Sequence, residues 1–138
     1  MPASAFDICE NATADLDRLW DSDPKAAAAV VVALDEVLAD PALIRKLTTH
    51  GDVQFQTHRL GIKRWREAQR SFNNLWRFRI LDTPATSYRV VYGFHWQLRH
   101  VCVLAIAHKD QLDYDNLDED LSERILADWF EITGGQDT

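Results

Sequence analysis

Three segments in the second half of the chain have residue patterns typical of β-strands: LWRFRIL, SYRVVYGF and VCVLAIAHK. In the first, apolar residues alternate with Arg77 and Arg79, and in the second they alternate with Arg89. Because successive side chains of a strand point to opposite faces, each of these strands has one apolar face and one that presents guanidinium groups. The third segment is apolar on both faces over residues 101–107, as expected of a central strand covered on both sides. The pattern therefore predicts a sheet with arginines on an open face, which would suit phosphate binding.

Two helices are predicted before these strands. Apolar residues recur at helical spacing in a first helix, for which Asn11 or Thr13 is the expected N-cap. A second helix is expected to start at Asp23-Pro24, because proline suits the first helical position and the aspartate can accept the free amide groups. It stops near Asp40-Pro41. We expect these two helices to form a hairpin that covers the sheet.

The remaining elements complete an α+β plan. Apolar and polar residues alternate, as in short strands, over residues 5–8 and 53–57. The region 42–72 as a whole gives no clear pattern. A last helix is expected from about Leu117 to Ile132, because its apolar residues form a stripe and two glycines follow. The predicted fold is a single domain over residues 1–138. In it, an N-terminal strand and a helical hairpin pack on a twisted antiparallel sheet of about four strands, a C-terminal helix follows, and the helices gather on one side of the sheet.

Composition narrows the class of protein. A chain of 138 residues with 46% hydrophobic residues and five tryptophans can form a core of its own. No apolar run approaches the ~20 residues of a membrane span, and the first residues lack the basic and apolar segments of a signal peptide. Cys9 and Cys102 are expected to be free thiols of a cytoplasmic protein. No spacing of histidines, cysteines and carboxylates resembles a metal site, so we expect neither a metal nor a cofactor.

Charge is segregated along the chain. There are 2 basic and 9 acidic side chains in residues 1–44, 12 and 3 in residues 45–109, and 1 and 10 in residues 110–138. The basic middle segment contains the arginine strands, and binding of a polyanion depends on this local field rather than on the net charge of −7. The alternative is that acidic helices and a basic sheet neutralise each other inside the fold.

The series LWRFRI, then SYRVVY, then VLAIAHK followed by Tyr114 resembles the RelE/ParE superfamily of toxins from type II toxin–antitoxin systems. The resemblance extends from Phe6 to about Tyr114, and it implies a helical hairpin followed by a twisted antiparallel sheet. By position, the catalytic residues of the ribonuclease branch correspond to Arg79, Arg89, Lys109 and Tyr114.

The resemblance implies an mRNA endoribonuclease, with dependence on the ribosome left open. It also implies a cognate antitoxin, whose acidic segment is expected to cover the basic sheet face. Cleavage by a 2′-hydroxyl group requires neutralisation of charge that builds up on the phosphate, and guanidinium groups supply this through paired hydrogen bonds. Lys109 is the candidate acid or base. Tyr114 or Trp96 is the candidate to stack on a base.

A further basic segment, IKRWREAQR, interleaves cations with an aromatic residue. Basic residues arranged in this way suit contacts to a nucleic-acid backbone. The predicted nucleic-acid contacts are Lys63, Arg64, Trp65, Arg66 and Arg77. The alternative interpretation is a surface helix in which Trp65 packs inward.

Two other functions stay open. Lys109 stands where ribosome-dependent members have arginine, and the last helix is acidic. These departures favour a ParE-like inhibitor of DNA gyrase that cleaves nothing, or a stand-alone binding protein that keeps the toxin fold without the activity. Under a purely structural interpretation, Arg77, Arg79 and Arg89 form a solvated face that is paired with acids of the last helix.

Overall fold

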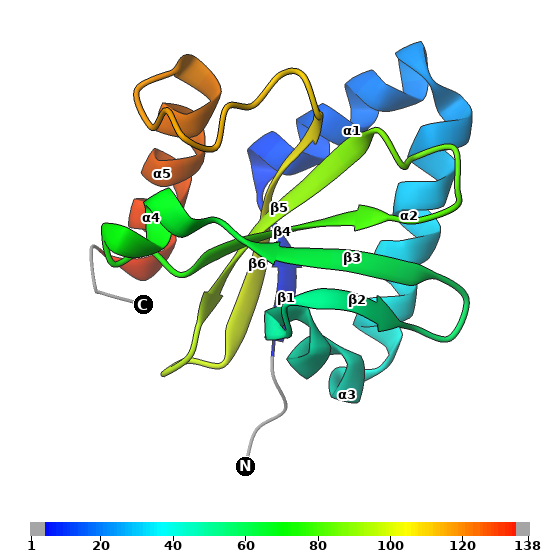
Figure 1. The fold of residues 1–138 in the computed structure, drawn as a ribbon, viewed down its shortest axis with the longest axis horizontal. Helices are drawn as coiled ribbons and strands as arrows, with labels where there is room; N and C mark the ends of the chain where they lie inside the picture. Colours follow the sequence, from blue (N-terminus) through cyan, green and yellow to red (C-terminus); the bar gives the residue numbers. More distant parts are fainter. Residues whose placement is uncertain (1–4, 135–138) are drawn as a thin grey trace.

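The centre of the fold is a six-stranded sheet with the strand order β1-β6-β5-β4-β3-β2 (Figure 1). The structure is a computed structural model, and it describes residues 5–134. The strands are β1 Ala5–Ile8, β2 Gly51–Gln54, β3 Arg59–Arg64, β4 Leu75–Ile80, β5 Tyr88–His95 and β6 His100–His108. β1 pairs with β6 in parallel, and the other neighbouring strands pair in antiparallel fashion.

The predicted α+β class is confirmed, but the sheet differs from the prediction. The expectation of about four antiparallel strands is wrong, because β1 adds a parallel edge and the poorly patterned region contributes both β2 and β3. The helices are α1 Glu10–Ser22, α2 Pro24–Ala39, α3 Pro41–Ile44, α4 Arg66–Arg70 and α5 Asp120–Thr133, with a 3₁₀ turn at Arg45–Thr48. No helix in the described part of the chain is long and apolar enough to cross a membrane.

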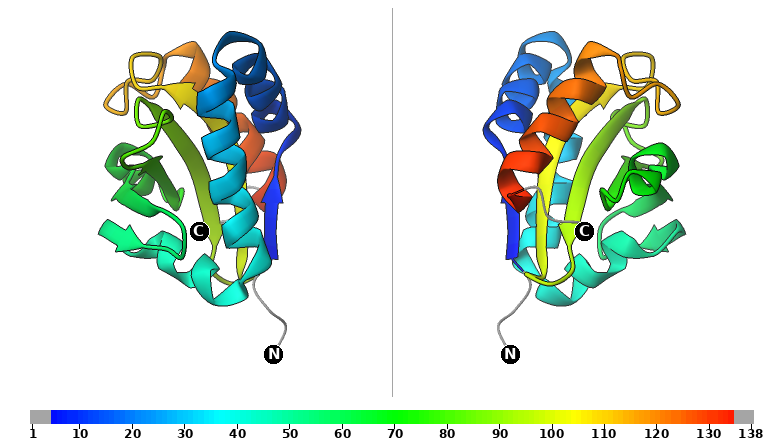
Figure 2. Two further views of the ribbon diagram at one scale, coloured as in Figure 1. Left: turned by 90° about the vertical axis from the view of Figure 1, so that its right-hand side faces the viewer. Right: turned by 90° about the vertical axis from the view of Figure 1, so that its left-hand side faces the viewer.

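Helices cover both faces of the sheet, and not one face as predicted. Figure 2 shows α2 lying across one face and α5 lying against the other. On the α1–α2 side, Val90 and Tyr92 of β5 belong to one core cluster. On the α5 side, Val91 packs with Ile125 and Trp129 in a second cluster. Adjacent residues of β5 are therefore divided between two cores, because successive side chains of a strand point in opposite directions.

A β-bulge shifts the register between β5 and β6. Val91 pairs with Ala105, whereas the next residue, Tyr92, pairs with Val103. Strict alternation would place Cys102 and Ile106 on the same face, but the extra residue puts Cys102 in the α5 cluster and Ile106 in the α1–α2 cluster. Every residue of β6 from 101 to 107 is buried, as predicted for a strand covered on both sides.

The close approach of α5 to the sheet depends on a glycine. A Cβ atom at Gly93 of β5 would lie 2.6 Å from the ring of Trp129. The indole is fully buried against this strand. Any side chain at residue 93 would therefore push α5 away from the sheet.

The helix boundaries were predicted with mixed success. α2 starts at Pro24 as predicted, and the Asp23 carboxylate accepts a hydrogen bond from the amide of Ala26 at 3.2 Å. The prediction of a cap for α1 is wrong, since this helix starts one residue before Asn11 and its N-cap residue, Cys9, makes no capping bond with its side chain. The last helix begins at Asp120 and not at residue 117.

Candidate functional site

A cavity of about 170 Å³ lies on the same face of the sheet as α5. It is formed by β3, β4, β5 and the segment between β6 and α5. Its lining residues are Gly61, Lys63, Arg77, Phe78, Arg79, Arg89, Lys109, Leu112 and Tyr114. Five of these residues are lysine or arginine, and none is acidic or histidine. We call this site the basic cavity.

Strand register brings the cations together. Lys63 is the partner of Arg77 across β3 and β4, and Gly61 is the partner of Arg79. The β4–β5 register, extended by one pair, places Arg79 opposite Arg89. Because paired residues project from the same face of a sheet, these side chains converge on one side. A Cβ atom at Gly61 would lie 3.3 Å from the Arg79 side chain, so the glycine leaves room for that arginine.

No carboxylate lines the basic cavity, although Asp115 of an adjoining groove attracts Arg77. Among the described residues, Arg77, Arg79 and Arg89 make no ion pair with a carboxylate. The interpretation that these arginines are paired with acids of the last helix is therefore wrong for the described residues. Burial, followed by the repulsion of a neighbouring arginine, lowers the pKa of Arg77 and of Arg89, although both remain charged at neutral pH. The Nη1 atom of Arg89 donates to the carbonyls of Thr86 and Tyr88 at 2.9 and 3.1 Å. The other N–H groups of Arg89 and the guanidinium of Arg79 are available to a bound anion.

Tyr114 is held at the rim of the cavity by stacking. The Arg77 guanidinium lies over its ring at 3.6 Å from the centroid, and the Trp65 ring meets it edge to face at 5.3 Å. The indole of Trp65 also donates a hydrogen bond to the carbonyl of Tyr114 at 2.8 Å. Because Arg77 occupies a face of the phenol ring, we do not assign Tyr114 to base stacking.

Trp65 does not belong to the predicted nucleic-acid contacts. Its side chain is fully buried and packs in the core cluster on the α5 side. A buried indole has no free face to offer a base, so the inward-packed alternative describes Trp65 correctly. Its contacts instead position the segment that carries Tyr114.

The hydroxyl group of Tyr114 is buried without a hydrogen bond of normal geometry to any described residue. Burial raises the pKa of Tyr114 to about 12, although the charges of Arg77 and Arg89 act in the opposite direction. The phenol is therefore protonated at neutral pH. It can donate a hydrogen bond or a proton, but it is a poor base.

Lys109 and Trp96 have different positions relative to the cavity. Lys109 is exposed just beyond the end of β6, and its backbone amide donates to the carbonyl of Ser87 at 2.8 Å. Trp96 is 59% exposed but follows the far end of β5, and a strand rises about 3.3 Å per residue. The predicted role of Trp96 in base stacking is therefore wrong for this cavity, because the residue lies a strand length away from Arg89.

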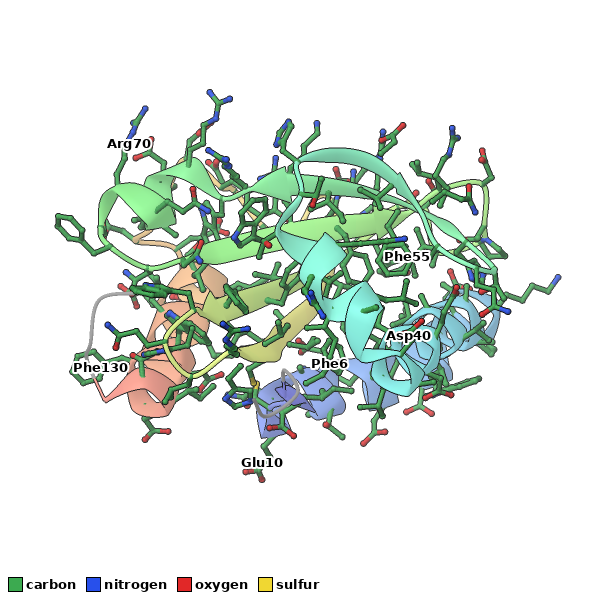
Figure 3. All side chains as sticks on the ribbon, turned by 90° about the horizontal axis from the view of Figure 1, so that it is seen from below. Phe6, Glu10, Asp40, Phe55, Arg70 and Phe130 are labelled. Atoms are coloured by element: carbon green, nitrogen blue, oxygen red, sulfur yellow. The ribbon has the colours of Figure 1, made fainter. Side chains whose placement is uncertain are left out.

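A shallower groove of about 530 Å³ adjoins the basic cavity and shares Lys63, Arg77, Leu112 and Tyr114 with it. Two predicted contacts, Arg64 and Arg66, line this groove. Its other lining residues are His50, Trp65, Glu67, Asp113 and Asp115. Figure 3 shows Arg70, at the end of α4, pointing away from the body of the sheet.

Sequence patterns did not identify His50, Gly61 or Leu112 as lining residues. They come from turns and from a strand that the pattern did not resolve, so no local periodicity marked them. Among the described residues, no group of three or more histidines, cysteines and carboxylates could hold a metal ion.

No protein-family model matches this sequence, and no curated protein matches it. Among solved structures, the archaeal RelE–RelB complex from Pyrococcus horikoshii OT3 contains a chain that is 13% identical to this one. The match covers 80% of this chain and 100% of that chain, with a TM-score of 0.40. A likeness at this identity and TM-score does not establish a shared family or activity.

Proposed function

We propose that this protein is the toxin of a type II toxin–antitoxin pair and that it binds and cleaves RNA in the cytoplasm at the basic cavity. One observation carries the proposal: five cationic side chains line a cavity whose lining contains no carboxylate. The sequence resemblance to RelE/ParE toxins supports the same conclusion independently of the geometry.

Each residue has a role in the proposed cleavage. Arg79 and Arg89 bind the scissile phosphate through paired hydrogen bonds and neutralise the charge that develops on it. The protonated hydroxyl of Tyr114 donates to a phosphate oxygen. Lys109 either accepts the proton of the attacking 2′-hydroxyl group or donates a proton to the leaving oxygen. It has this role because the cavity lining holds neither a histidine nor a carboxylate.

Inducible expression in a bacterium tests the proposal. We expect growth and translation to stop with the wild-type chain and to continue with the double variant Arg79→Ala/Arg89→Ala. Lys25→Ala/Arg45→Ala is the matched control, since both side chains are exposed, lie outside the basic cavity and account for the same loss of charge. Cleavage of labelled RNA with and without ribosomes then determines whether the ribosome is required. Arrest that persists in Arg79→Ala/Arg89→Ala would rule out the proposed site.

The proposed partner is an antitoxin with an acidic segment that covers the basic cavity. The cluster of cations in the cavity lining favours such a segment by charge complementarity. We expect a small reading frame beside the gene to encode the antitoxin. Co-expression of the two is expected to restore growth and to yield a complex that high salt weakens. Rescue without a complex would contradict direct binding.

A second candidate function is non-catalytic inhibition, as in a ParE-like inhibitor of DNA gyrase or a stand-alone binding protein. The buried, protonated phenol and the absence of a histidine or carboxylate from the cavity lining favour it. Parallel assays of RNA cleavage and gyrase supercoiling separate the two functions. Inhibited supercoiling with intact RNA would establish the second.

A further inference from the structure

A second and larger cavity of about 660 Å³ lies at the free edge of β6, between α1 and α5. β1 pairs with β6 only over His100–Val103, so among residues 5–134 no strand lies beside the second half of β6 on this edge. There, the carboxylate of Asp15 in α1 accepts a hydrogen bond from the amide of Ile106 at 3.0 Å. We call this site the edge cavity.

The one carboxylate in the lining of the edge cavity is already saturated. Asp15 receives two hydrogen bonds from Arg124 of α5, at 3.0 and 2.7 Å, in addition to the one from Ile106. It also receives one from Arg18, whose side chain is 68% exposed. The buried Nε atom of Arg124 has no partner among the described residues. The Nη2 atom of Arg124 also donates to the carbonyl of Leu104 at 3.2 Å. Two arginines thus share one carboxylate, and the exposed Arg18 keeps N–H groups available to a ligand.

Other lining groups also present hydrogen-bond donors. The Oε1 atom of Gln111 accepts from the amide of His108 at 2.7 Å, which leaves the side-chain NH₂ group free to donate. The Nδ1 atom of His108 accepts from the amide of Asp110 at 3.2 Å in the tautomer that carries its hydrogen on Nε2, and the Asp110 carboxylate lies 3.5 Å from the same Nδ1 atom. In the described part of the chain, the hydroxyl groups of Ser22 and Tyr88 have no hydrogen-bond partner. Donors therefore outnumber free acceptors, and this suits a ligand that carries an oxyanion.

The edge cavity is separate from the basic cavity, although both adjoin the same strand ends. Tyr88 and His108 are paired across β5 and β6, and both line the edge cavity. The next residues, Arg89 and Lys109, line the basic cavity. Because neighbouring residues of a strand point to opposite faces, these pairs separate the two cavities, which share no lining residue.

We propose that the edge cavity binds a small molecule through a phosphate or carboxylate group, with Arg18 as the main contact. Arg124 and His108 supply further donors. The volume exceeds that of an oxyanion alone, so the cavity also accommodates the body of a small metabolite. The site requires neither RNA cleavage nor an antitoxin, so it does not depend on the proposed function.

Titration of ¹⁵N-labelled full-length protein, followed by NMR, tests this inference. The Arg79→Ala/Arg89→Ala background removes the two arginines that would bind phosphate in the basic cavity. The probes are inorganic phosphate, acetate and adenosine 5′-monophosphate, each in its own titration. The first two distinguish a phosphate ligand from a carboxylate ligand, and the third tests for a larger ligand. We expect saturable shifts at Ile106, His108 and the Nε–H of Arg124 with at least one probe.

Arg18→Ala in the same background is expected to weaken that binding about tenfold, the equivalent of one charge-assisted hydrogen bond. Lys25→Ala is the matched control, because it removes an exposed cation outside the cavity. His108→Gln is expected to weaken binding to a smaller extent. Thermal unfolding of each variant checks that the fold is kept. Shifts that never saturate with any probe, or equal affinity in Arg18→Ala and Lys25→Ala, would overturn the inference.

Discussion

The residues most closely tied to the proposed function are Arg79 and Arg89, which stand on adjacent strands with their side chains on one face of the sheet. Their local alternation with apolar residues was evident in the sequence. Their proximity follows from the pairing of β4 with β5, and no carboxylate among the described residues neutralises them. Each guanidinium group therefore supplies a separate contact to a bound phosphate.

Removal of one guanidinium group is expected to weaken RNA binding. A hydrogen bond to a charged group contributes about 1.5–3 kcal/mol, so Arg79→Ala and Arg89→Ala should each reduce affinity for a short RNA by roughly 10- to 100-fold. Fluorescence anisotropy measures the affinity, and Lys25→Ala is the control. A loss below threefold in both variants would show that the phosphate binds elsewhere.

Substitution by phenylalanine, which removes the hydroxyl group, should have different effects on the free energy of unfolding at Tyr114 and at Tyr92. The Tyr114 hydroxyl is buried without a hydrogen bond of normal geometry among the described residues, whereas the Tyr92 hydroxyl donates to the carbonyl of Leu47. Tyr114→Phe should therefore keep or raise the free energy of unfolding at pH 7 while it weakens RNA binding. Tyr92→Phe should lower that free energy by about 1 kcal/mol. Urea unfolding gives the free energies. Strong destabilisation by Tyr114→Phe would mean that its hydroxyl has a structural partner.

The pKa of Tyr114 also predicts a dependence of stability on pH. Burial raises this pKa to about 12 from the ordinary value of 10, so folding favours the protonated phenol. That contribution is fully present below pH 10 and is lost as pH rises toward 12. Between pH 9 and pH 11, wild-type protein should therefore lose more stability than Tyr114→Phe, as followed by urea unfolding at each pH. Parallel losses in the two proteins would contradict the raised pKa.

At the scale of elements, one region of the sheet stays accessible because α5 and the segment before it cover only part of the face on which they pack. The helix docks where Gly93 admits the Trp129 ring, while the neighbouring region of β3, β4 and β5 carries the basic cavity. Asp15 and Arg124 join α1 to α5 across the edge of β6. The positions of these few contacts determine which part of the sheet remains accessible.

Substitution of two glycines by alanine should distinguish an effect on stability from an effect on RNA binding. Gly93→Ala places a Cβ atom 2.6 Å from the Trp129 ring, so overpacking is expected to cost about 1–3 kcal/mol of unfolding free energy. Gly61→Ala meets only the flexible side chains of Arg79 and Asp52 at 3.3–3.4 Å. It should change stability less, yet displace Arg79 and weaken RNA binding. Urea unfolding and anisotropy measure the two effects, and equal destabilisation by both substitutions would contradict this division.

For the whole molecule, the segregation of charge matters more than its sum. The net charge is −7, yet the middle of the chain supplies the cations that line the basic cavity. The local positive field can therefore attract a polyanion, although the negative net charge of the protein would repel it.

Salt should weaken RNA binding steeply. For three to five phosphate contacts, the slope of log K against log salt is roughly −2 to −3.5 for a single strand, which gives about a 15- to 130-fold loss between 50 and 200 mM KCl. Anisotropy over this range measures the slope, and Arg79→Ala/Arg89→Ala should make it shallower by about 1.4. A slope near zero would exclude an electrostatic interface.

Local patterns in the sequence were sufficient for several features. They placed the arginines of β4 and β5 opposite apolar residues, predicted the start of α2 at Asp23-Pro24, and indicated the α+β class. These features depend on the direction of successive side chains and on capping, and both are set by neighbouring residues.

Only the tertiary structure decided which residues meet. The pairing of β3 with β4 brought Lys63 to Arg77, and packing buried Trp65 and fixed Tyr114 beneath an arginine. The bulge in β6 divided Cys102 and Ile106 between the two cores, and the docking of α5 left two separate cavities near the same strand ends. Register and packing join residues that are distant along the chain, and side-chain periodicity carries no information about such distances.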